Sequence, residues 1–299
     1  MAYLRKVLLV AMLLPQLLVA NKFQPYNKQG KWFSLDQHLE LGLGGAVCKL
    51  RDEHTSPLTY KGPAGMLDIA YWIQGQRFAT SLDFNMAVGG LNNSVENGDQ
   101  QAMFNMYFDI NAQFGWKVYE ENNISVFPGV KLQYMSNQWV NASYFNSAFQ
   151  FNQSFLIGLN FYAERPIYFR GKIREFDGEM YEMIPNLKIS WDLSLPFTGI
   201  TAIPPYALGD ITDPDASLIQ SDSNIYISSI GQGLFVLDSK INADWYLKNG
   251  NALRLSYWWR FNQFKVTEFK TQYAIHGVSL AILFRTDRKR KSKIPVTER

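Results

Sequence analysis

The sequence predicts an all-β protein, a closed antiparallel barrel whose strands cross a membrane. Three observations lead to this fold class. Residues 104–118 alternate apolar and polar side chains without a break. Similar two-faced segments recur along most of the chain. After residue 20, no apolar run reaches the roughly 20 residues that a spanning helix needs.

The segment 104–118 is the clearest of the predicted strands. Successive side chains of a strand point to opposite faces, so Phe104, Phe108 and Trp116 share one wall, whereas Asp109 and Lys117 share the other. Strands of soluble proteins average about 5–6 residues. A longer alternation that is rich in aromatic residues predicts lipid outside the barrel and a polar interior.

Nine further segments show the same pattern. They are 39–47, 67–73, 78–88, 124–134, 149–161, 187–195, 225–247, 253–262 and 278–284. We therefore expect ten strands. An even number of strands places the first and the last residue of the barrel on the same side of the membrane, the periplasm. The connection 163–181 leaves an alternative open: it forms either an extra hairpin, which makes twelve strands, or a separate periplasmic element.

The connections alternate in length. Short ones fall at 74–76, 120–123 and 248–251, and we expect longer ones near 50–65, 90–101, 137–147, 198–224 and 264–271. Short turns on the periplasmic side and long loops on the other side are typical of membrane barrels.

The two ends of the chain predict further segments. Arg5 and Lys6 precede an apolar run and a small residue at position 20, which predicts a signal peptide over 1–20. We expect a periplasmic segment over 21–36, the barrel over 37–284 and a basic, solvated periplasmic tail over 285–299. Cys48 is the only cysteine, which excludes an intrachain disulfide.

With its signal peptide and two-faced strands, the chain resembles a bacterial outer-membrane β-barrel protein, the small Gram-negative type of about 8–12 strands, over residues 35–284. The resemblance implies contact with outer-membrane lipid and a closing strand that the barrel-assembly machinery recognises. The residues that match this assembly signal are Val278, Leu280, Ile282 and Phe284. In many members the aromatic residue ends the chain, whereas here residues 285–299 follow.

The inward face predicts a charge network in which the two signs balance. Its members are Glu40, Asp68, Asp83, Asp109, Asp192, Asp238 and Asp244, with Arg77, Lys117, Lys131, Lys188, Lys240, Arg254 and Arg260. Desolvated charges need partners, so we expect them to pair across the lumen. Trp72, Tyr107, Phe127 and Trp258 also point inward. This predicts a mostly plugged interior with a narrow polar path at most.

Two loop motifs could carry chemistry. His54 and Ser56 have the spacing that places a base and a hydroxyl nucleophile on one face of a strand. They fall in an expected loop before Pro57, so a solvated cluster is the favoured interpretation. Asp210, Asp213 and Asp215 could hold Ca²⁺ or act as an acid–base pair. An ordinary Asp/Pro/Gly turn is favoured there.

The remaining motifs limit the function. The sequence has no phosphate-binding glycine loop before a helix and no zinc-ligand spacing, so we expect no cofactor and no nucleic-acid partner. We expect a non-catalytic structural or binding role as a subunit of a larger envelope complex, with partners bound through 163–181 and 285–299. The alternatives are a narrow pore for ions or small solutes and a surface-facing lipid or peptide hydrolase.

Overall fold

The computed structural model describes residues 36–53, 56–94, 100–141, 149–169, 173–176, 179–182, 185–203, 224–247, 249–266, 269–286 and 293–294. The expected signal peptide over 1–20 and nearly all of the segment 21–36 lie outside these residues. Among the described residues, none belongs to a helix long and apolar enough to span a membrane.

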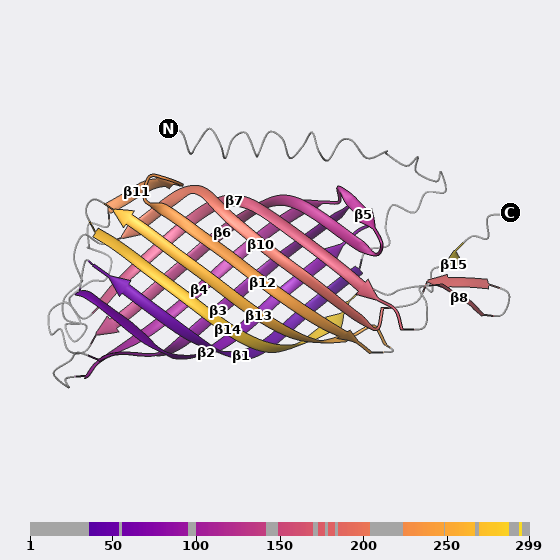
Figure 1. Cartoon of the computed structure of the whole chain (residues 1–299), viewed down its shortest axis with the longest axis horizontal. Helices are drawn as coiled ribbons and strands as arrows, with labels where there is room; N and C mark the ends of the chain where they lie inside the picture. The colour runs from indigo at the N-terminus through magenta and orange to yellow at the C-terminus, as the bar shows by residue number, and fades with distance from the viewer. Residues whose placement is uncertain are drawn as a thin grey trace.

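Ten strands form a closed antiparallel barrel (Figure 1). They are β1 (Asp36–Asp52), β2 (Ser56–Gln74), β3 (Phe78–Ser94), β4 (Gln100–Trp116), β6 (Ile124–Asn141), β7 (Phe149–Ile167), β10 (Leu187–Ile203), β12 (Leu234–Tyr246), β13 (Ala252–Val266) and β14 (Phe269–Arg285). Each strand pairs with the next of these in the chain, and β14 closes the barrel on β1, with Leu280 opposite Leu43. The prediction of ten strands is confirmed.

The two ends of the barrel differ, and we call them the turn end and the loop end. The turn end lies on the right in Figure 1 and holds the start of β1, the end of β14 and the turns around 75–77 and 247–251. The loop end holds the last residue of β10 and the first residue of β11 (Asn224–Ser229). β11 pairs with the last residues of β10, whereas β12 pairs with its first half.

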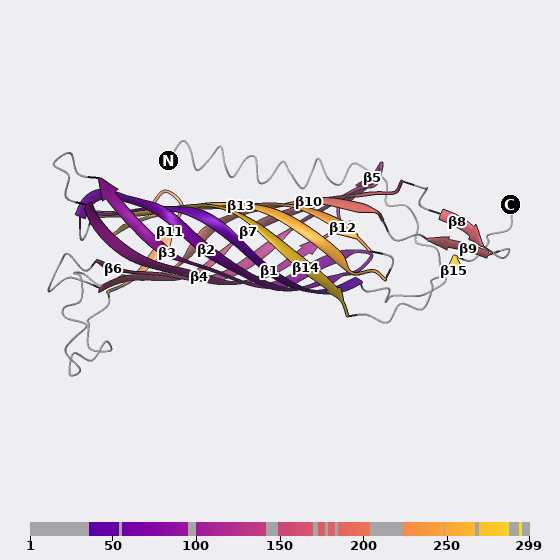
Figure 2. The ribbon, with the colours of Figure 1, turned by 90° about the horizontal axis from the view of Figure 1, so that it is seen from below.

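The connection after β7 forms a sheet of its own at the turn end (Figures 1 and 2). β8 (Ile173–Phe176) and β9 (Glu179–Glu182) are antiparallel, and β15 (Lys293–Ile294) pairs with β9. The hairpin is therefore a separate element and not a barrel hairpin. Two residues of the segment 285–299, Lys293 and Ile294, therefore form a strand in this sheet. β5 (Tyr119–Glu121) is a further short strand, paired with β6.

The strands are longer than the sequence predicts, and two of the expected long loops are wrong. β2 already begins at Ser56 and β14 at Phe269, so only 53–55 and 267–268 connect the strands there. The physical reason is a change of polarity along the strands. Near the loop end the apolar side chains face inward and the polar ones outward, which is the reverse of the pattern that marks a membrane strand.

The outer wall is apolar over most of the barrel. Leu43 on β1, Leu280 on β14 and Phe104 on β4 are 70%, 69% and 53% exposed and point away from the interior. Such exposure of large apolar side chains around a closed barrel is expected only where lipid replaces water.

Near the loop end the outer wall becomes polar. On β1, Val47 is followed on the same face by Lys49, while Cys48 and Leu50 between and beyond them are buried. On β6, Trp139 points inward and is 2% exposed, whereas its neighbour Gln138 is on the outer face. Strands of 17–19 residues exceed the roughly 9–11 that cross a bilayer, so the barrel extends beyond the membrane at this end.

Candidate functional site in the barrel interior

The interior near the turn end is organised around Arg254 on β13. Its Nε and Nη2 donate to Oδ1 and Oδ2 of Asp244 at 2.6 and 2.8 Å, and Nη1 donates to Oε2 of Glu40 at 2.5 Å. The indole of Trp72 donates to the same Glu40 oxygen at 3.0 Å, and the guanidinium lies over the Trp72 ring at 5.4 Å. A single arginine thus satisfies two carboxylates that would be costly to bury alone.

Two lysines extend this cluster across the barrel. Lys188 Nζ on β10 lies 3.7 Å from carboxylate oxygens of both Glu164 and Asp244, and Lys240 Nζ lies 3.5 Å from Glu40. Glu164 was missed by the sequence analysis, because the predicted strand ended at residue 161. Continuing the alternation of β7 by two inward positions would have found it.

A second cluster surrounds Arg260, which is 1% exposed in its side chain. Its guanidinium donates to Asp109, Asp238 and the hydroxyl of Tyr107, and it lies 4.8 Å from the centre of the Trp258 ring. These side chains project from β4, β12 and β13 and meet in the interior of the barrel.

Further donors complete the second cluster. Lys131 Nζ donates to Asp238 at 2.8 Å and to the Ser194 hydroxyl at 3.2 Å, and the Trp258 indole donates to Asp238 at 2.7 Å. Asn85 donates to Asp109 at 2.8 Å. Asp109, Asp238 and Arg260 therefore each have several partners in this cluster.

The charges do not balance as the sequence analysis expected. Among the described residues of these clusters and the wall between them, carboxylates outnumber bases by eight to five. The carboxylates are Glu40, Asp68, Asp83, Asp109, Glu164, Asp192, Asp238 and Asp244, and the bases are Lys131, Lys188, Lys240, Arg254 and Arg260. Asp68 illustrates the excess of carboxylates over bases, because neither of its carboxylate oxygens has a hydrogen-bond partner among the described residues.

Two predicted members lie elsewhere. Lys117 follows the end of β4 at the turn end and pairs with Glu120 at 3.1 Å, with its ammonium 5.5 Å from the Phe127 ring centre. Arg77 is exposed in the turn between β2 and β3. The sequence analysis placed both side chains inside because it extended the alternation beyond the ends of the strands. In a turn, successive side chains no longer alternate between the two faces of a sheet.

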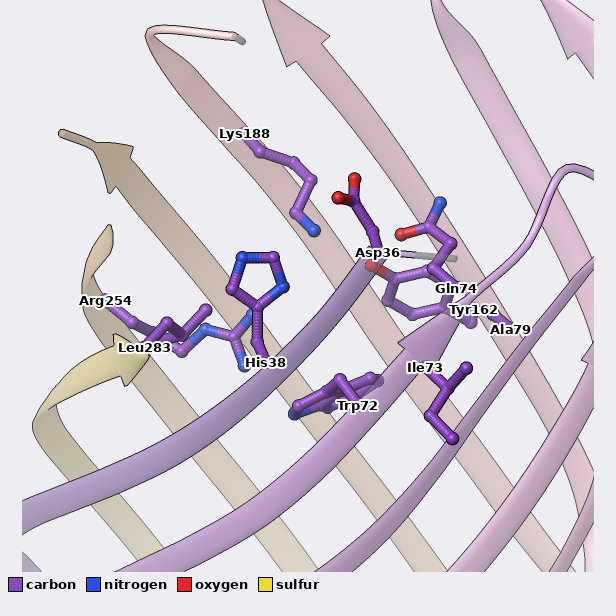
Figure 3. A pocket seen from close by; sticks show the side chains of 10 residues that line it. All are labelled: Asp36, His38, Trp72, Ile73, Gln74, Ala79, Tyr162, Lys188, Arg254 and Leu283. Carbon is purple, nitrogen blue, oxygen red and sulfur yellow. The ribbon is translucent and has the colours of Figure 1, made fainter. Parts of the chain in front are cut away.

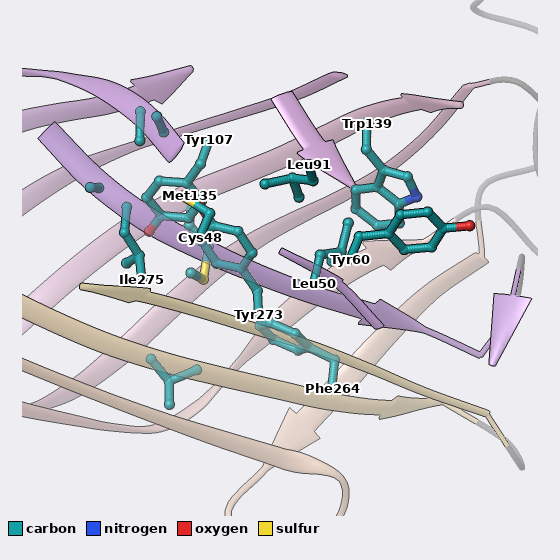
Figure 4. Close-up of a cluster of buried hydrophobic side chains, with 14 of the residues drawn as sticks. Cys48, Leu50, Tyr60, Leu91, Tyr107, Met135, Trp139, Phe264, Tyr273 and Ile275 are labelled. Atoms are coloured by element: carbon teal, nitrogen blue, oxygen red, sulfur yellow. The ribbon is translucent and has the colours of Figure 1, made fainter. Parts of the chain in front are cut away.

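The loop end of the interior is an apolar core (Figure 4). Leu50, Tyr60 and Leu91 are at most 1% exposed, and Trp139 packs with them. Tyr273 stacks on Tyr107 at 5.1 Å between ring centres, which joins this core to the Arg260 cluster. The sequence analysis missed this core, although Leu50, Tyr60 and Trp139 already alternate with polar neighbours.

A small cavity opens at the turn end (Figure 3). It lies between His38, Trp72, Tyr162, Lys188 and Arg254 and offers about 20 Å³ to the centres of water molecules. That is enough for about one water and too little for a larger solute.

The other predicted sites receive no support from geometry. His54 and the acidic group Asp210, Asp213 and Asp215 lie outside the described residues, and Ser56 is the first residue of β2. Within the part of the chain that the structure describes, no three His, Cys, Asp or Glu side chains are placed to hold a metal ion.

The closing strand β14 presents its predicted assembly residues to the outside. Val278, Leu280, Ile282 and Phe284 are 51%, 69%, 44% and 39% exposed, and β14 pairs with both β13 and β1. An apolar wall faces outward and paired charges lie within a closed ten-strand barrel. The fold is a closed ten-strand antiparallel β-barrel with an apolar outer wall.

No family model and no curated protein matches the sequence. Among solved structures, the chain is similar to the outer membrane protease OmpT from Escherichia coli, at 8% identity and a TM-score of 0.48, with 87% of this chain and 100% of that chain covered.

Two further similar structures come from Neisseria. The translocator domain of the autotransporter NalP from Neisseria meningitidis gives 9% identity and a TM-score of 0.39 over 84% of this chain and 88% of that chain. Neisserial surface protein A gives 8% and 0.30 over 82% and 97%. These outer-membrane barrels differ in role, and the likeness carries no information on the activity of this chain.

Proposed function

We propose that the protein is a non-conducting outer-membrane barrel that holds a small periplasmic β-sheet as a docking site for another envelope protein. The short turns and both barrel termini share one end, which assigns that end to the periplasm by the usual pattern of such barrels. The role is structural or binding, as a subunit of a larger envelope complex.

The observation that carries this proposal is the pairing of β15 with β9. Lys293 lies opposite Tyr181, and Ile294 opposite Met180. The tail and the connection after β7 are the two features that distinguish this chain from a minimal barrel, and they meet in one sheet. β8 and the two-residue β15 are the edge strands of that sheet, and an edge strand offers its backbone groups to a strand of a partner.

The packed interior favours this role over the pore. The apolar core fills the loop end, and the Arg254 and Arg260 clusters fill the middle and the turn end. Conduction would require water to pass both layers, and about ten strands leave a lumen that side chains can fill. Of the candidate residues for the hydrolase alternative, the structure describes Ser56, the first residue of β2.

The test is native mass analysis of the full chain, extracted gently from its own outer membrane. We expect a companion in fixed stoichiometry that is lost when residues 287–299 are deleted. The matched control replaces 207–220, in the connection between β10 and β11, by a short Gly-Ser linker and should keep the companion. A chain that runs alone in all three forms would refute the docking role.

Planar-bilayer recording tests the sealed interior independently. We expect no discrete conductance steps from the full chain. Reproducible steps that change in Asp109→Asn or Lys188→Gln would establish the pore instead, because both residues lie in the network that blocks the lumen.

A further inference from the structure

The outer wall near the loop end carries two pairs of lysines that face each other directly. Lys49 on β1 lies opposite Lys61 on β2, and Lys265 on β13 lies opposite Lys270 on β14. All four side chains are exposed on the outer face. Like charges in directly opposite positions of an antiparallel pair destabilise the sheet, so both pairs need an explanation outside the fold.

No acid among the described residues neutralises these lysines. None of the four forms an ion pair there, and their lateral neighbours on the outer wall include Asn92 and Ala274. Among the described residues, Glu53 is bound to Arg51 at 3.1 Å and accepts the backbone N–H of Lys270 at 3.1 Å. The described part of this surface therefore carries an excess of positive charge.

Lys49 and Lys61 border the apolar wall. On β1 the outward residue before Lys49 is Val47, 45% exposed, and on β2 the exposed Pro63 lies one outward position from Lys61 on the membrane side. On β14, His276 lies between the apolar wall and Lys270, and its Nδ1 is 3.0 Å from the Tyr257 hydroxyl. Aromatic and amphipathic side chains of this kind mark the level of lipid headgroups.

The tilt of the strands reduces the difference in level between the two pairs. β13, β14, β1 and β2 are neighbours, and Lys270 lies about four residues further toward the loop end, in register, than Lys49. In Figure 1 the strands run obliquely, so register partners on β13 lie nearer the turn end than those on β2. At a tilt of about 35–45° and a spacing of about 4.8 Å, each strand step shifts the level by about one residue.

We infer that Lys49, Lys61, Lys265 and Lys270 form a binding surface for the phosphate groups of lipid headgroups in the leaflet that surrounds the loop end. We call these four residues the lysine belt. Each pair presents two ammonium groups that an anionic phosphate can bridge, which converts the repulsion within the pair into attraction. The inference rests on the proposed outer-membrane location and is independent of the docking sheet.

Lipid binding by the purified full chain tests the belt. Mixed micelles would contain phosphatidic acid, whose headgroup is a phosphate monoester, or zwitterionic phosphatidylcholine as the comparison. We expect the chain to bind phosphatidic acid preferentially, with affinity falling roughly fivefold for each lysine that is neutralised. The double variants Lys49→Gln/Lys61→Gln and Lys265→Gln/Lys270→Gln each remove one pair.

The control removes the same charge elsewhere. Arg77→Gln/Arg165→Gln changes two exposed cations near the turn end and should bind phosphatidic acid like the unchanged chain. An equal loss of phosphatidic acid binding in this control would show that the binding depends on net charge and not on the lysine belt. A chain without any preference for phosphatidic acid would overturn the inference.

Thermal unfolding gives a second readout with opposite signs. In phosphatidylcholine micelles, Lys49→Gln/Lys61→Gln should raise the melting temperature, because it removes the repulsion within the pair. In phosphatidic acid micelles the same variant should lower it. The same sign in both lipids would contradict the belt, and stabilisation by inorganic phosphate alone would assign the surface to free anions. Either result leaves the docking role standing.

Discussion

Arg254 and Asp244 lie directly opposite each other on β13 and β12, and the guanidinium donates one hydrogen bond to each carboxylate oxygen, at 2.6 and 2.8 Å. Both side chains are buried, at 3% and 0% exposure. The remaining nitrogen of Arg254 donates to Glu40. One planar cation therefore binds two carboxylates from opposite sides, a geometry that the ammonium of a lysine cannot reproduce.

We expect Arg254→Met to destabilise the barrel by about 3–5 kcal/mol, because it leaves Asp244 and Glu40 buried without their main partner. Urea unfolding in detergent measures the change. The triple variant Glu40→Gln/Asp244→Asn/Arg254→Met should recover part of the loss, because it removes both carboxylates left without Arg254, while Lys240 loses its partner Glu40. As a control, Lys117→Met breaks an ion pair at the exposed rim and should cost less than about 1 kcal/mol. Equal costs for the two single variants would contradict the assigned burial.

The apolar outer wall predicts that the cost of placing a charge on the outer face depends on its position along the barrel axis. Leu280→Arg places a cation in the apolar wall of β14 and should destabilise insertion by about 2–4 kcal/mol. Gln272→Arg makes the same change further along the same strand and face, near the loop end, and should cost about 0–1 kcal/mol. Folding into lipid vesicles at increasing urea measures both. Similar costs would show that the wall does not face lipid at Leu280.

Gly44 and Gly65 provide a matched pair of glycine tests on adjacent strands. A Cβ on Gly44 would lie 2.2 Å from the Val278 carbonyl oxygen and 2.7 Å from Cα of Ser279, so β1 and β14 would have to move apart. We expect Gly44→Ala to cost about 1–3 kcal/mol. A Cβ on Gly65 meets open space, and Gly65→Ala should be neutral or slightly stabilising. Urea midpoints in the same detergent compare the two variants directly.

The pairing of the tail with the hairpin predicts a specific cross-link. In a Cys48→Ala background, Lys293→Cys/Tyr181→Cys should form a disulfide, because opposite residues of an antiparallel pair have Cα atoms about 4.5–5.5 Å apart. Lys293→Cys/Arg174→Cys is the control: Arg174 is opposite Tyr181 on the far side of β9, about 10 Å from Lys293. Gel mobility without reductant reads the result. Efficient cross-linking of the control would argue against this strand order.

Much of the barrel could be predicted from alternation alone. Leu43, Leu280 and Phe104 fall on an apolar face, and Asp109 and Arg260 on a polar one, because lipid outside and polar groups inside impose a period of two on every strand. The inward positions of Trp72, Tyr107, Phe127 and Trp258 follow from the same period. The alternation does not show which charges meet. Arg254 on β13, for example, contacts Glu40 on β1, beyond the point where β14 closes the barrel on β1.

The loop end could not be predicted in the same way. Tyr60 and Leu50 point into an apolar core, and Lys61 and Lys49 point outward, so the strand continues while the contrast between its faces reverses. A search for apolar residues on one constant face ends where this reversal begins. For the same reason Ser56 and the start of β2 fall in an expected loop. The β9–β15 pairing joins residues more than a hundred positions apart, and no local pattern indicates it.

The reversal of the outer wall has a consequence for the surrounding membrane. Val47 and Lys49 are successive outward residues on β1, about 7 Å apart along the strand. Sliding the barrel by one such step would draw ammonium groups into hydrocarbon or push aliphatic side chains into water. The protein therefore cannot adjust its depth to a thicker or thinner bilayer. Hydrophobic mismatch must be absorbed by the lipids, which have to stretch or compress around a rigid cylinder of fixed height.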